Sequence, residues 1–317
     1  LNANLKQGCG ILLIASVALL SILALLPDAD VDHDAGYTAS ELSIRETVDE
    51  NVTSTSYVNS DGGITDAIDM GYATVCRMRD DNDRVVKERY LDASGNPVAR
   101  YGDYYGLSYE YEEASTVITY LDAKGNPMKR SAGYTTIVRT RAGGRASDDF
   151  YYDLNGQQVQ CAGEYYGLRR EFNTEGQNTS LTFLDKDGHT VCTSLGYASK
   201  TYQRDENGTV VGEQYFDTEG NPVRSLLGQY GELYQRNEQG YISQITYLDA
   251  DCNPAPTNAG YTILKRTYHR DGTADTDMYF DVNGSPKALS KGRYGIKRSG
   301  KVSLLLDRNG NVMPCVD

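Results

Sequence analysis

Aromatic, apolar and acidic positions recur together at a fixed spacing along most of this chain. At seven places an aromatic–apolar pair is followed by aspartate, and successive aspartates lie 30, 31, 32, 32, 32 and 32 residues apart. These aspartates are Asp92, Asp122, Asp153, Asp185, Asp217, Asp249 and Asp281. A fixed period of this length is typical of repeat proteins, in which each unit buries its apolar face by stacking on its neighbours. The spacing therefore predicts one β-repeat array over residues 51–317.

Each of these aspartates is expected to open a turn. Glycine follows the aspartate by three positions in all units except one, where Cys252 stands instead. An aspartate can accept hydrogen bonds from the amides ahead of it, and glycine adopts positive φ without strain, so the pattern predicts a type I turn with a bulge. The predicted structural turn residues are Asp92, Gly95, Asp122, Gly125, Asp153, Gly156, Asp185, Gly188, Asp217, Gly220, Asp281 and Gly284.

Short strands are expected between the turns. A second glycine lies 12 positions before the first in several units, as Gly208 lies before Gly220. The residues between the two turns, such as 209–216 and 241–248, have the length and the β-branched and aromatic content of strands. Each unit of about 32 residues thus divides into 12 and 20 residues. This division predicts two or three strands per unit and no helix.

Two kinds of corner alternate along the array. One unit carries Gly-Tyr, at residues 71–72, 133–134, 196–197 and 260–261, and the next carries Tyr-Gly, at 105–106, 166–167, 230–231 and 294–295. The true repeat is therefore a pair of units, and we attribute the alternation to corner geometry. The predicted fold is all-β: an elongated, solenoid-like array of β-hairpins with a period of about 32 residues and a two-unit superperiod.

An apolar segment near the N-terminus predicts one transmembrane helix before the array. Residues 8–26 contain no charged side chain and, at 1.5 Å per residue, reach about 28 Å, which is close to one hydrocarbon core. We expect a cytoplasmic stub at 1–7, an anchor at 8–27 and an extracellular array, because Lys6 lies on the short side. The alternative is a cleaved signal peptide, although the segment is longer than most and no small-residue cleavage motif follows it.

Residues 28–50 are expected to form an acidic linker with a short helix. Four aspartates follow the apolar segment, and the run Thr38-Ala39-Ser40-Glu41 has the pattern of a capping box, with a hydroxyl at the N-cap and a carboxylate three residues later. The pattern predicts a helix from this cap to about Asp49.

Composition narrows the range of partners. The net charge is −13, which argues against nucleic acid and against an anionic lipid surface, because both are bound through basic patches. The chain holds 26 Tyr but only 5 Phe and no Trp, so its core must be built from rings that each need a partner for a hydroxyl group.

No catalytic residue, metal site or cofactor site is predicted, and the chain is not expected to be an enzyme. The three histidines are not spaced as metal ligands, and no nucleophile elbow, P-loop or dinucleotide motif is present. The periodic aspartates could form a calcium ladder, but one periodic carboxylate per turn is few for an ion that takes six to eight oxygens. A Cys161–Cys192 bridge is geometrically conceivable, and we favour free buried thiols.

The tyrosines divide into two groups. The strand tyrosines are expected to form the core: Tyr90, Tyr120, Tyr151, Tyr215, Tyr247 and Tyr279. The corner tyrosines are expected to be more exposed and are therefore the candidate ligand-binding residues: Tyr72, Tyr134, Tyr197 and Tyr261.

The pattern aromatic–apolar–Asp-x-x-Gly-Asn-Pro, followed by Gly-Tyr and a strand ending in Asp-x-x-Gly, resembles the tyrosine-rich repeats of bacterial surface proteins. Over residues 57–317 it looks most like YD repeats of the RHS type and, more loosely, WG-type repeats. The resemblance implies an extracellular or cell-envelope β-structure. Together with the predicted anchor, it leads us to expect a membrane-anchored extracellular repeat protein in adhesion, in binding of a cell-wall polymer, a glycan or another surface protein, or in spacing. The alternative is the C-terminal repeat tail of a larger cell-envelope enzyme whose catalytic domain lies upstream of Leu1.

Overall fold

The structure is a single β-sheet built from hairpins that follow one another along the chain. A computed structural model describes residues 35–162, 164–299 and 302–314. No α-helix occurs in these ranges, and two short 3₁₀-helices are present, η3 (Ala39–Glu41) and η4 (Ser290–Gly292). The strands are β1 (Ser43–Asp49), β2 (Val52–Val58), β3 (Thr74–Arg79), β4 (Val85–Leu91), β5 (Gly106–Tyr111), β6 (Ser115–Leu121), β7 (Thr136–Ala142), β8 (Arg145–Tyr152), β9 (Gly167–Phe172), β10 (Asn178–Leu184), β11 (Ser199–Arg204), β12 (Val210–Phe216), β13 (Gly231–Arg236), β14 (Ile242–Leu248), β15 (Ile263–Tyr268), β16 (Ala274–Phe280), β17 (Gly295–Ser299) and β18 (Val302–Leu306).

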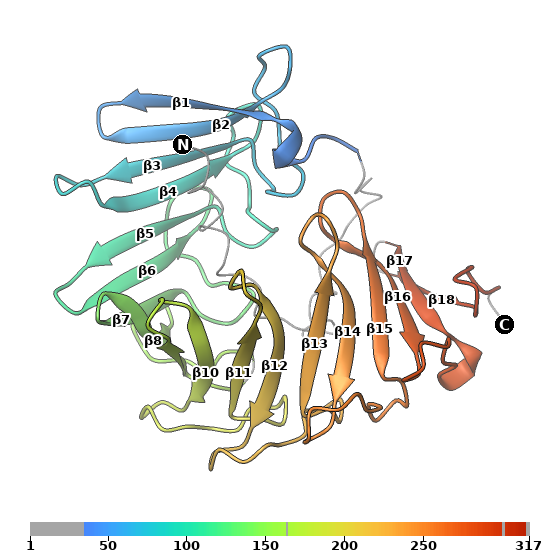
Figure 1. The fold of residues 1–317 in the computed structure, drawn as a ribbon. Helices are drawn as coiled ribbons and strands as arrows, with labels where there is room; N and C mark the ends of the chain where they lie inside the picture. Colours follow the sequence, from blue (N-terminus) through green and yellow to red (C-terminus); the bar gives the residue numbers. More distant parts are fainter. Residues whose placement is uncertain (1–34, 163, 300–301, 315–317) are drawn as a thin grey trace.

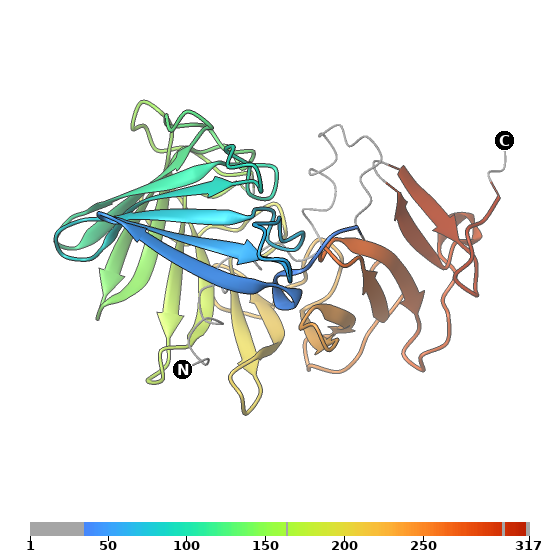
Figure 2. The same cartoon turned by 90° about the horizontal axis from the view of Figure 1, so that it is seen from above.

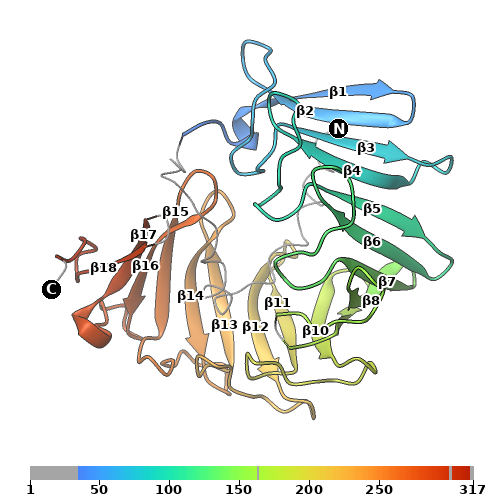
Figure 3. The ribbon, with the colours of Figure 1, turned by 180° about the vertical axis from the view of Figure 1, so that it is seen from behind.

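Every strand pairs antiparallel with its neighbours in sequence, from β1–β2 to β17–β18, so the 18 strands form one open sheet. This arrangement confirms the predicted all-β hairpin array. Its path is curved instead of straight: the strands follow an arc in Figure 1, which Figure 3 shows from behind, and they fan out when seen from above in Figure 2. The arc brings Glu41 within 2.7 Å of Arg270, 229 residues later in the chain.

The two ends of the strands are connected differently. At one end a short turn closes each hairpin, as at Asp205–Gly208 between β11 and β12, where the Gly208 amide donates to the Asp205 carbonyl. At the other end a longer loop crosses to the next hairpin and opens with the turn that the sequence analysis marked by Asp and Gly. The division into 12 and 20 residues therefore separates the hairpin from the connecting loop, and each unit contributes two strands.

The turn after β12 shows how the periodic aspartate acts. One carboxylate oxygen of Asp217 accepts hydrogen bonds from the amides of Glu219 and Asn221, at 2.8 and 2.9 Å, while Gly220 adopts φ 83°. The other aspartate-led turns repeat these contacts, and Cys252 takes φ 64° at the glycine position of its own turn. Folding is therefore sufficient to explain the periodic aspartates. The glycines with positive φ in these turns are Gly95, Gly125, Gly156, Gly188, Gly220 and Gly284.

The two kinds of corner need glycine for different reasons. Gly196, in a Gly-Tyr corner, adopts φ 91°, a backbone conformation that L-residues other than glycine rarely take. Gly167, in a Tyr-Gly corner, begins β9, and a Cβ there would collide with the Asp149 carbonyl oxygen and the Phe150 ring. The left-handed turn recurs in the Tyr-Gly units, as at Gly228 with φ 94°, so the close approach of two strands is what distinguishes the alternate units.

The core is a stack of aromatic rings in two runs, on the face of the sheet that the connecting loops cover, which we call the aromatic ladder. Neighbouring rings lie 4.4–5.9 Å apart between centroids, and such pairs contribute about 0.5–1.5 kcal/mol beyond their burial. The predicted core tyrosines of the strands are all buried. The ladder comprises Tyr57, Tyr72, Tyr90, Tyr104, Tyr120, Tyr134, Tyr151, Tyr165, Phe183, Tyr197 and Tyr215, and then Tyr247, Tyr261 and Tyr279.

The predicted helix up to Asp49 is wrong. The Glu41 carboxylate does accept the Thr38 amide at 2.8 Å, as a capping box requires, but the helix is only the three-residue η3. Leu42 is already extended, and Ser43–Asp49 continues as β1 because β2 satisfies its backbone groups and Ile44, Thr47 and Val48 favour a strand. The sheet therefore begins at Ser43, before the predicted boundary at residue 51.

Two further predictions concern the anchor and the cysteines. Within the ranges that the structure describes, no helix is long and apolar enough to cross a membrane, and the predicted anchor at 8–27 lies outside those ranges. Cys76, Cys161, Cys192 and Cys252 are free thiols, so Cys161 and Cys192 form no bridge. Cys161 is buried as expected, whereas Cys192 and Cys252 are exposed.

Candidate functional site

The predicted exposure of the corner tyrosines is wrong. Tyr72, Tyr134, Tyr197 and Tyr261 are only 5–8% exposed. Each ring lies in the aromatic ladder between strand aromatics, and Tyr197 stacks on Tyr215 with centroids 4.4 Å apart. Because the connecting loops fold back over the sheet, a corner in the sequence is an interior position in the fold. The argument that made these four residues ligand-binding candidates therefore fails.

Carboxylates recur inside the sheet, two residues before the strand aromatic in every second unit. They alternate there with aliphatic side chains, and this alternation is the side-chain counterpart of the two-unit superperiod. The sequence shows the pattern, although the sequence analysis did not use it. The acidic members are Glu88, Asp149, Glu213 and Asp277, and the aliphatic members are Ile118, Leu181 and Ile245.

Asp149 shows how such a charge is accommodated. It is 1% exposed and binds Arg139 of β7 through two hydrogen bonds of 2.7 and 2.8 Å, while Arg170 of β9 contacts it at 2.9 Å. Burial alone would raise the pKa of Asp149, but the two guanidinium groups outweigh it and hold the pKa below its usual value. Asp277 repeats this arrangement with Arg266 and Arg298.

The third pair of units replaces this arrangement. Lys200 of β11 replaces an aliphatic residue, because the other pairs carry Val75, Ile137 and Leu264 at this position. Glu232 of β13 also replaces an aliphatic residue, because the other pairs carry Leu107, Leu168 and Ile296 there. Together with Glu213, these charges lie inside the sheet at exposures of 2%, 1% and 5% for Lys200, Glu232 and Glu213. Lys200 Nζ lies 2.8 Å from Glu213 Oε2. Burial works against the ammonium, but the Glu213 carboxylate outweighs it and raises the Lys200 pKa.

Glu232 is held by neutral hydrogen-bond donors. The Tyr234 hydroxyl donates to Oε2 and Gln229 Nε2 donates to Oε1, both at 3.0 Å. Glu232 lies directly opposite Glu213 in the β12–β13 register. Burial and then the charge of Glu213 raise the pKa of Glu232 to about 7. One ammonium thus faces two carboxylates, and we call Lys200, Glu213, Gln229, Glu232 and Tyr234 the Glu232 cluster.

The aromatic ladder is interrupted at the same place. Gln229 occupies the position that Tyr104 and Tyr165 occupy in earlier units, so a ring is replaced by an amide. Among the described residues, ring-to-ring contacts run from Tyr57 to Tyr215 and resume at Tyr247. The buried apolar residues accordingly form two clusters, one ending at β12 and one beginning at β13.

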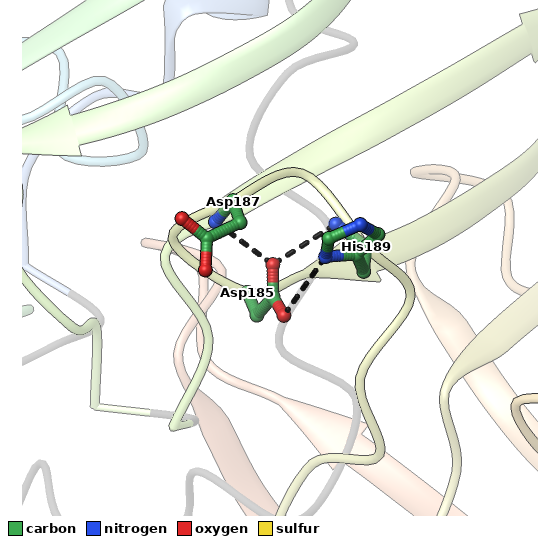
Figure 4. A group of neighbouring side chains, drawn as sticks. All are labelled: Asp185, Asp187 and His189. Atoms are coloured by element: carbon green, nitrogen blue, oxygen red, sulfur yellow. Dashed lines mark hydrogen bonds and ion pairs between the residues drawn. The ribbon is translucent and has the colours of Figure 1, made fainter.

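A separate group of side chains on the surface has the composition of a cation site. Asp185, Asp187 and His189 lie in the turn after β10, and their potential ligand atoms lie within 4.8 Å of one another (Figure 4). Asp185 accepts the amides of Asp187 and His189 at 2.9 Å each, and its second oxygen lies 3.5 Å from His189 Nδ1. The sequence analysis predicted no metal site, because it assigned Asp185 and His189 to the turn alone.

This group can supply three ligands from one exposed turn. Calcium takes six to eight oxygens, and zinc sites normally use three or four protein ligands held by a second shell. The Asp185 carboxylate already serves the turn, so the geometry is explained by folding.

A shallow depression of about 380 Å³ lies beside the β1–β2 hairpin. It is polar and open, and its lining carries no nucleophile paired with a base. The lining residues are Val48, Glu50, Asn51, Thr53, Arg79, Asp80, Asp81 and Asp83.

Comparisons with known proteins find no sequence match and only remote structural similarity. No protein-family model matches the sequence, and no curated protein matches it at a significant level. Among solved structures, a porin-like protein from Bacteroides uniformis is 11% identical, with a TM-score of 0.24, over 77% of this chain and 97% of that one. Two further structures, TcdB2–TccC3–TEV and TcdB2–TccC3–Cdc42, are 11% and 10% identical, with TM-scores of 0.20 and 0.18.

The chain covers 17% and 18% of the chains in those two complexes, and they cover 87% and 86% of it. TM-scores this low carry no functional argument. The assignment of the chain as a β-repeat protein rests on its own sheet of sequential hairpins.

Proposed function

We propose that this chain is a membrane-anchored extracellular repeat protein, whose array binds a cell-envelope polymer, a glycan or another surface protein, or acts as a spacer. One observation carries the proposal: 18 strands form a single sheet in which each hairpin packs on the next. Such an array presents an extended surface instead of one cavity, which suits a binding platform or a spacer.

The outer side of the sheet is the surface on which binding is expected. The ladder tyrosines and the turn residues serve the fold, and their side chains are buried or engaged in turns. Alternate strand positions on the opposite side are exposed and vary from unit to unit, as in Arg169, Thr201, Gln235 and Lys265. A partner that reads these varying polar side chains would contact several hairpins at once.

The location can be tested with the chain's own thiols. Cys192 and Cys252 are exposed in the array, so a membrane-impermeant maleimide should label them in intact cells that make the protein. The Cys192→Ser/Cys252→Ser variant is the matched control, and lysed cells give the maximum signal. Labelling only after lysis would contradict an extracellular array.

Binding needs a second experiment, which uses the full chain in detergent or membrane vesicles. Retention on purified peptidoglycan, teichoic acid or a glycan panel supports the polymer-binding form of the proposal. Extracellular labelling without retention on any of them leaves binding to another surface protein or the spacer form.

A further inference from the structure

The Glu232 cluster lies where the core of the array divides, at the boundary between β12 and β13. We propose that this boundary is a pH-responsive joint, which is closed when the Glu232 carboxyl is protonated and loosens when it is ionised. The proposal is independent of what the array binds.

Several substitutions fall in one cross-section of the sheet, by which we mean a set of three neighbouring strands, here β11–β13. Lys200 and Glu232 replace aliphatic residues, Gln229 replaces a ladder ring, and Tyr202 takes the position of Arg77, Arg139 and Arg266. The cross-sections around Asp149 and Asp277 pair each carboxylate with two arginines. This one combines a single ion pair, Lys200–Glu213, with hydrogen bonds to Glu232 whose strength depends on its protonation.

The charges around Glu232 do not balance. Lys200 and Tyr202 face the cluster from β11, Glu213 and Tyr215 from β12, Tyr234 from β13 and Tyr247 from β14, and Tyr197 and Tyr261 face it from the connecting loops. Lys200 is the one cation of this set, and its ammonium is bound to Glu213. Within the described ranges Glu232 forms no ion pair, so its ionisation would place a second negative charge beside Glu213 without a second cation.

The sign of the pH effect follows from the pKa of Glu232. In the closed array this pKa is raised to about 7, whereas the ordinary value of a glutamate is 4.5. The closed state therefore binds the proton more tightly, and its stability falls as the pH rises from 4.5 through 7. Asp149 and Asp277, whose pKa values are lowered, lose their contribution only in acid, and the buried tyrosines, whose pKa values are raised, titrate in alkali. His189 and His269 lie on turns outside the joint.

Hydrogen exchange of the full chain, resolved to single hairpins, tests the proposal. After correction for intrinsic exchange rates, the opening equilibrium of the β12 and β13 amides should rise about tenfold between pH 6 and pH 8, because Glu232 would titrate near 7 when closed and near 4.5 when open. The amides of β7–β9 are the internal reference and should show no such rise. An equal rise in both regions, or none in β12–β13, would overturn the proposal.

Variants at one position separate the carboxyl from the rest of the cluster. Glu232→Gln keeps the shape of the side chain and cannot ionise, but its amide has one accepting oxygen where the carboxylate has two. Glu232→Leu restores the residue of the Leu168 position. Both should remove the pH dependence of β12–β13 exchange, whereas Asp277→Asn should leave it unchanged. A tenfold rise that persisted in Glu232→Gln would also refute the proposal, and the wild-type measurement decides the matter if a variant fails to fold.

Discussion

Two cross-sections of the sheet have the same strand pairing and register but accommodate buried carboxylates differently. Around Asp149, two arginines from the flanking strands enclose one carboxylate, and the aromatic ladder passes through unbroken. Around Glu232, one lysine faces two carboxylates, and the ladder stops. Turns and strand pairing keep the hairpins in place in both regions. The buried carboxylate can therefore be fully paired, as Asp149 is, or titratable, as Glu232 is, without any change in the pairing of the strands.

The largest effect is expected where a paired charge loses its partner. Asp149→Leu leaves Arg139 and Arg170 buried without a carboxylate, because each arginine side chain is only 14% exposed. The free energy of unfolding should fall by about 3–5 kcal/mol in a denaturant titration. The control is Asp148→Ala, which removes the more exposed ion pair with Arg169 and should cost less than about 1 kcal/mol. Equal losses would show that Asp149 is not a distinct structural element.

A smaller effect, of opposite sign, is expected when the joint is rebuilt as an ordinary cross-section. The variant Lys200→Val, Tyr202→Arg, Gln229→Tyr, Glu232→Leu copies the residues of the β3–β5 cross-section onto β11–β13. It removes the buried charges of Lys200 and Glu232 and the Gln229 amide, and it gives Glu213 an arginine partner, so it should stabilise the fold at pH 8 by about 1–4 kcal/mol. Denaturant titrations at pH 6 and pH 8 check this. A gain that is no larger at pH 8 than at pH 6 would argue against the raised pKa of Glu232.

The smallest effect should distinguish the two corners. Gly133→Ala is strained because φ is 101°, whereas Gly167→Ala places a methyl group against the Asp149 carbonyl, so each should cost about 1–3 kcal/mol. Asparagine tolerates positive φ, so Gly133→Asn should recover part of the loss. Gly167→Asn should recover none. Thermal melts of the four variants provide the measurement, and equal rescue at both corners would contradict the two causes.

Much of the fold can be predicted from local signals. The aspartate and glycine of each turn act within five residues of one another, so their spacing in the sequence is enough to predict the geometry of the turn. The failure at β1 has the same local origin. A capping box predicts a helix start, but the strand preference of Ile44, Thr47 and Val48 and the pairing with β2 decide the outcome.

The candidate site depends on contacts that cross between strands. The corner tyrosines look exposed in the sequence, and their burial follows only when the loops fold back over the sheet. Glu232 was missed for a related reason: its position opposite Glu213 follows from the β12–β13 register, across a loop of fourteen residues between Phe216 and Gly231. The alternation of acidic and aliphatic residues two positions before the strand aromatic was a signal that could have located the buried carboxylates, Glu213 among them.

The meander has a kinetic consequence. Each strand pairs with strands that are near in sequence, so most of the loops that must close are short and the entropy lost in closing each of them is small. A hairpin can form and pack on the previous one as soon as its own residues are available. The Glu41–Arg270 contact is different, because it joins residues 229 positions apart and must wait for the β15–β16 hairpin, which carries Arg270. A chain that emerges N-terminus first could therefore fold progressively and add each new hairpin to a sheet that already exists.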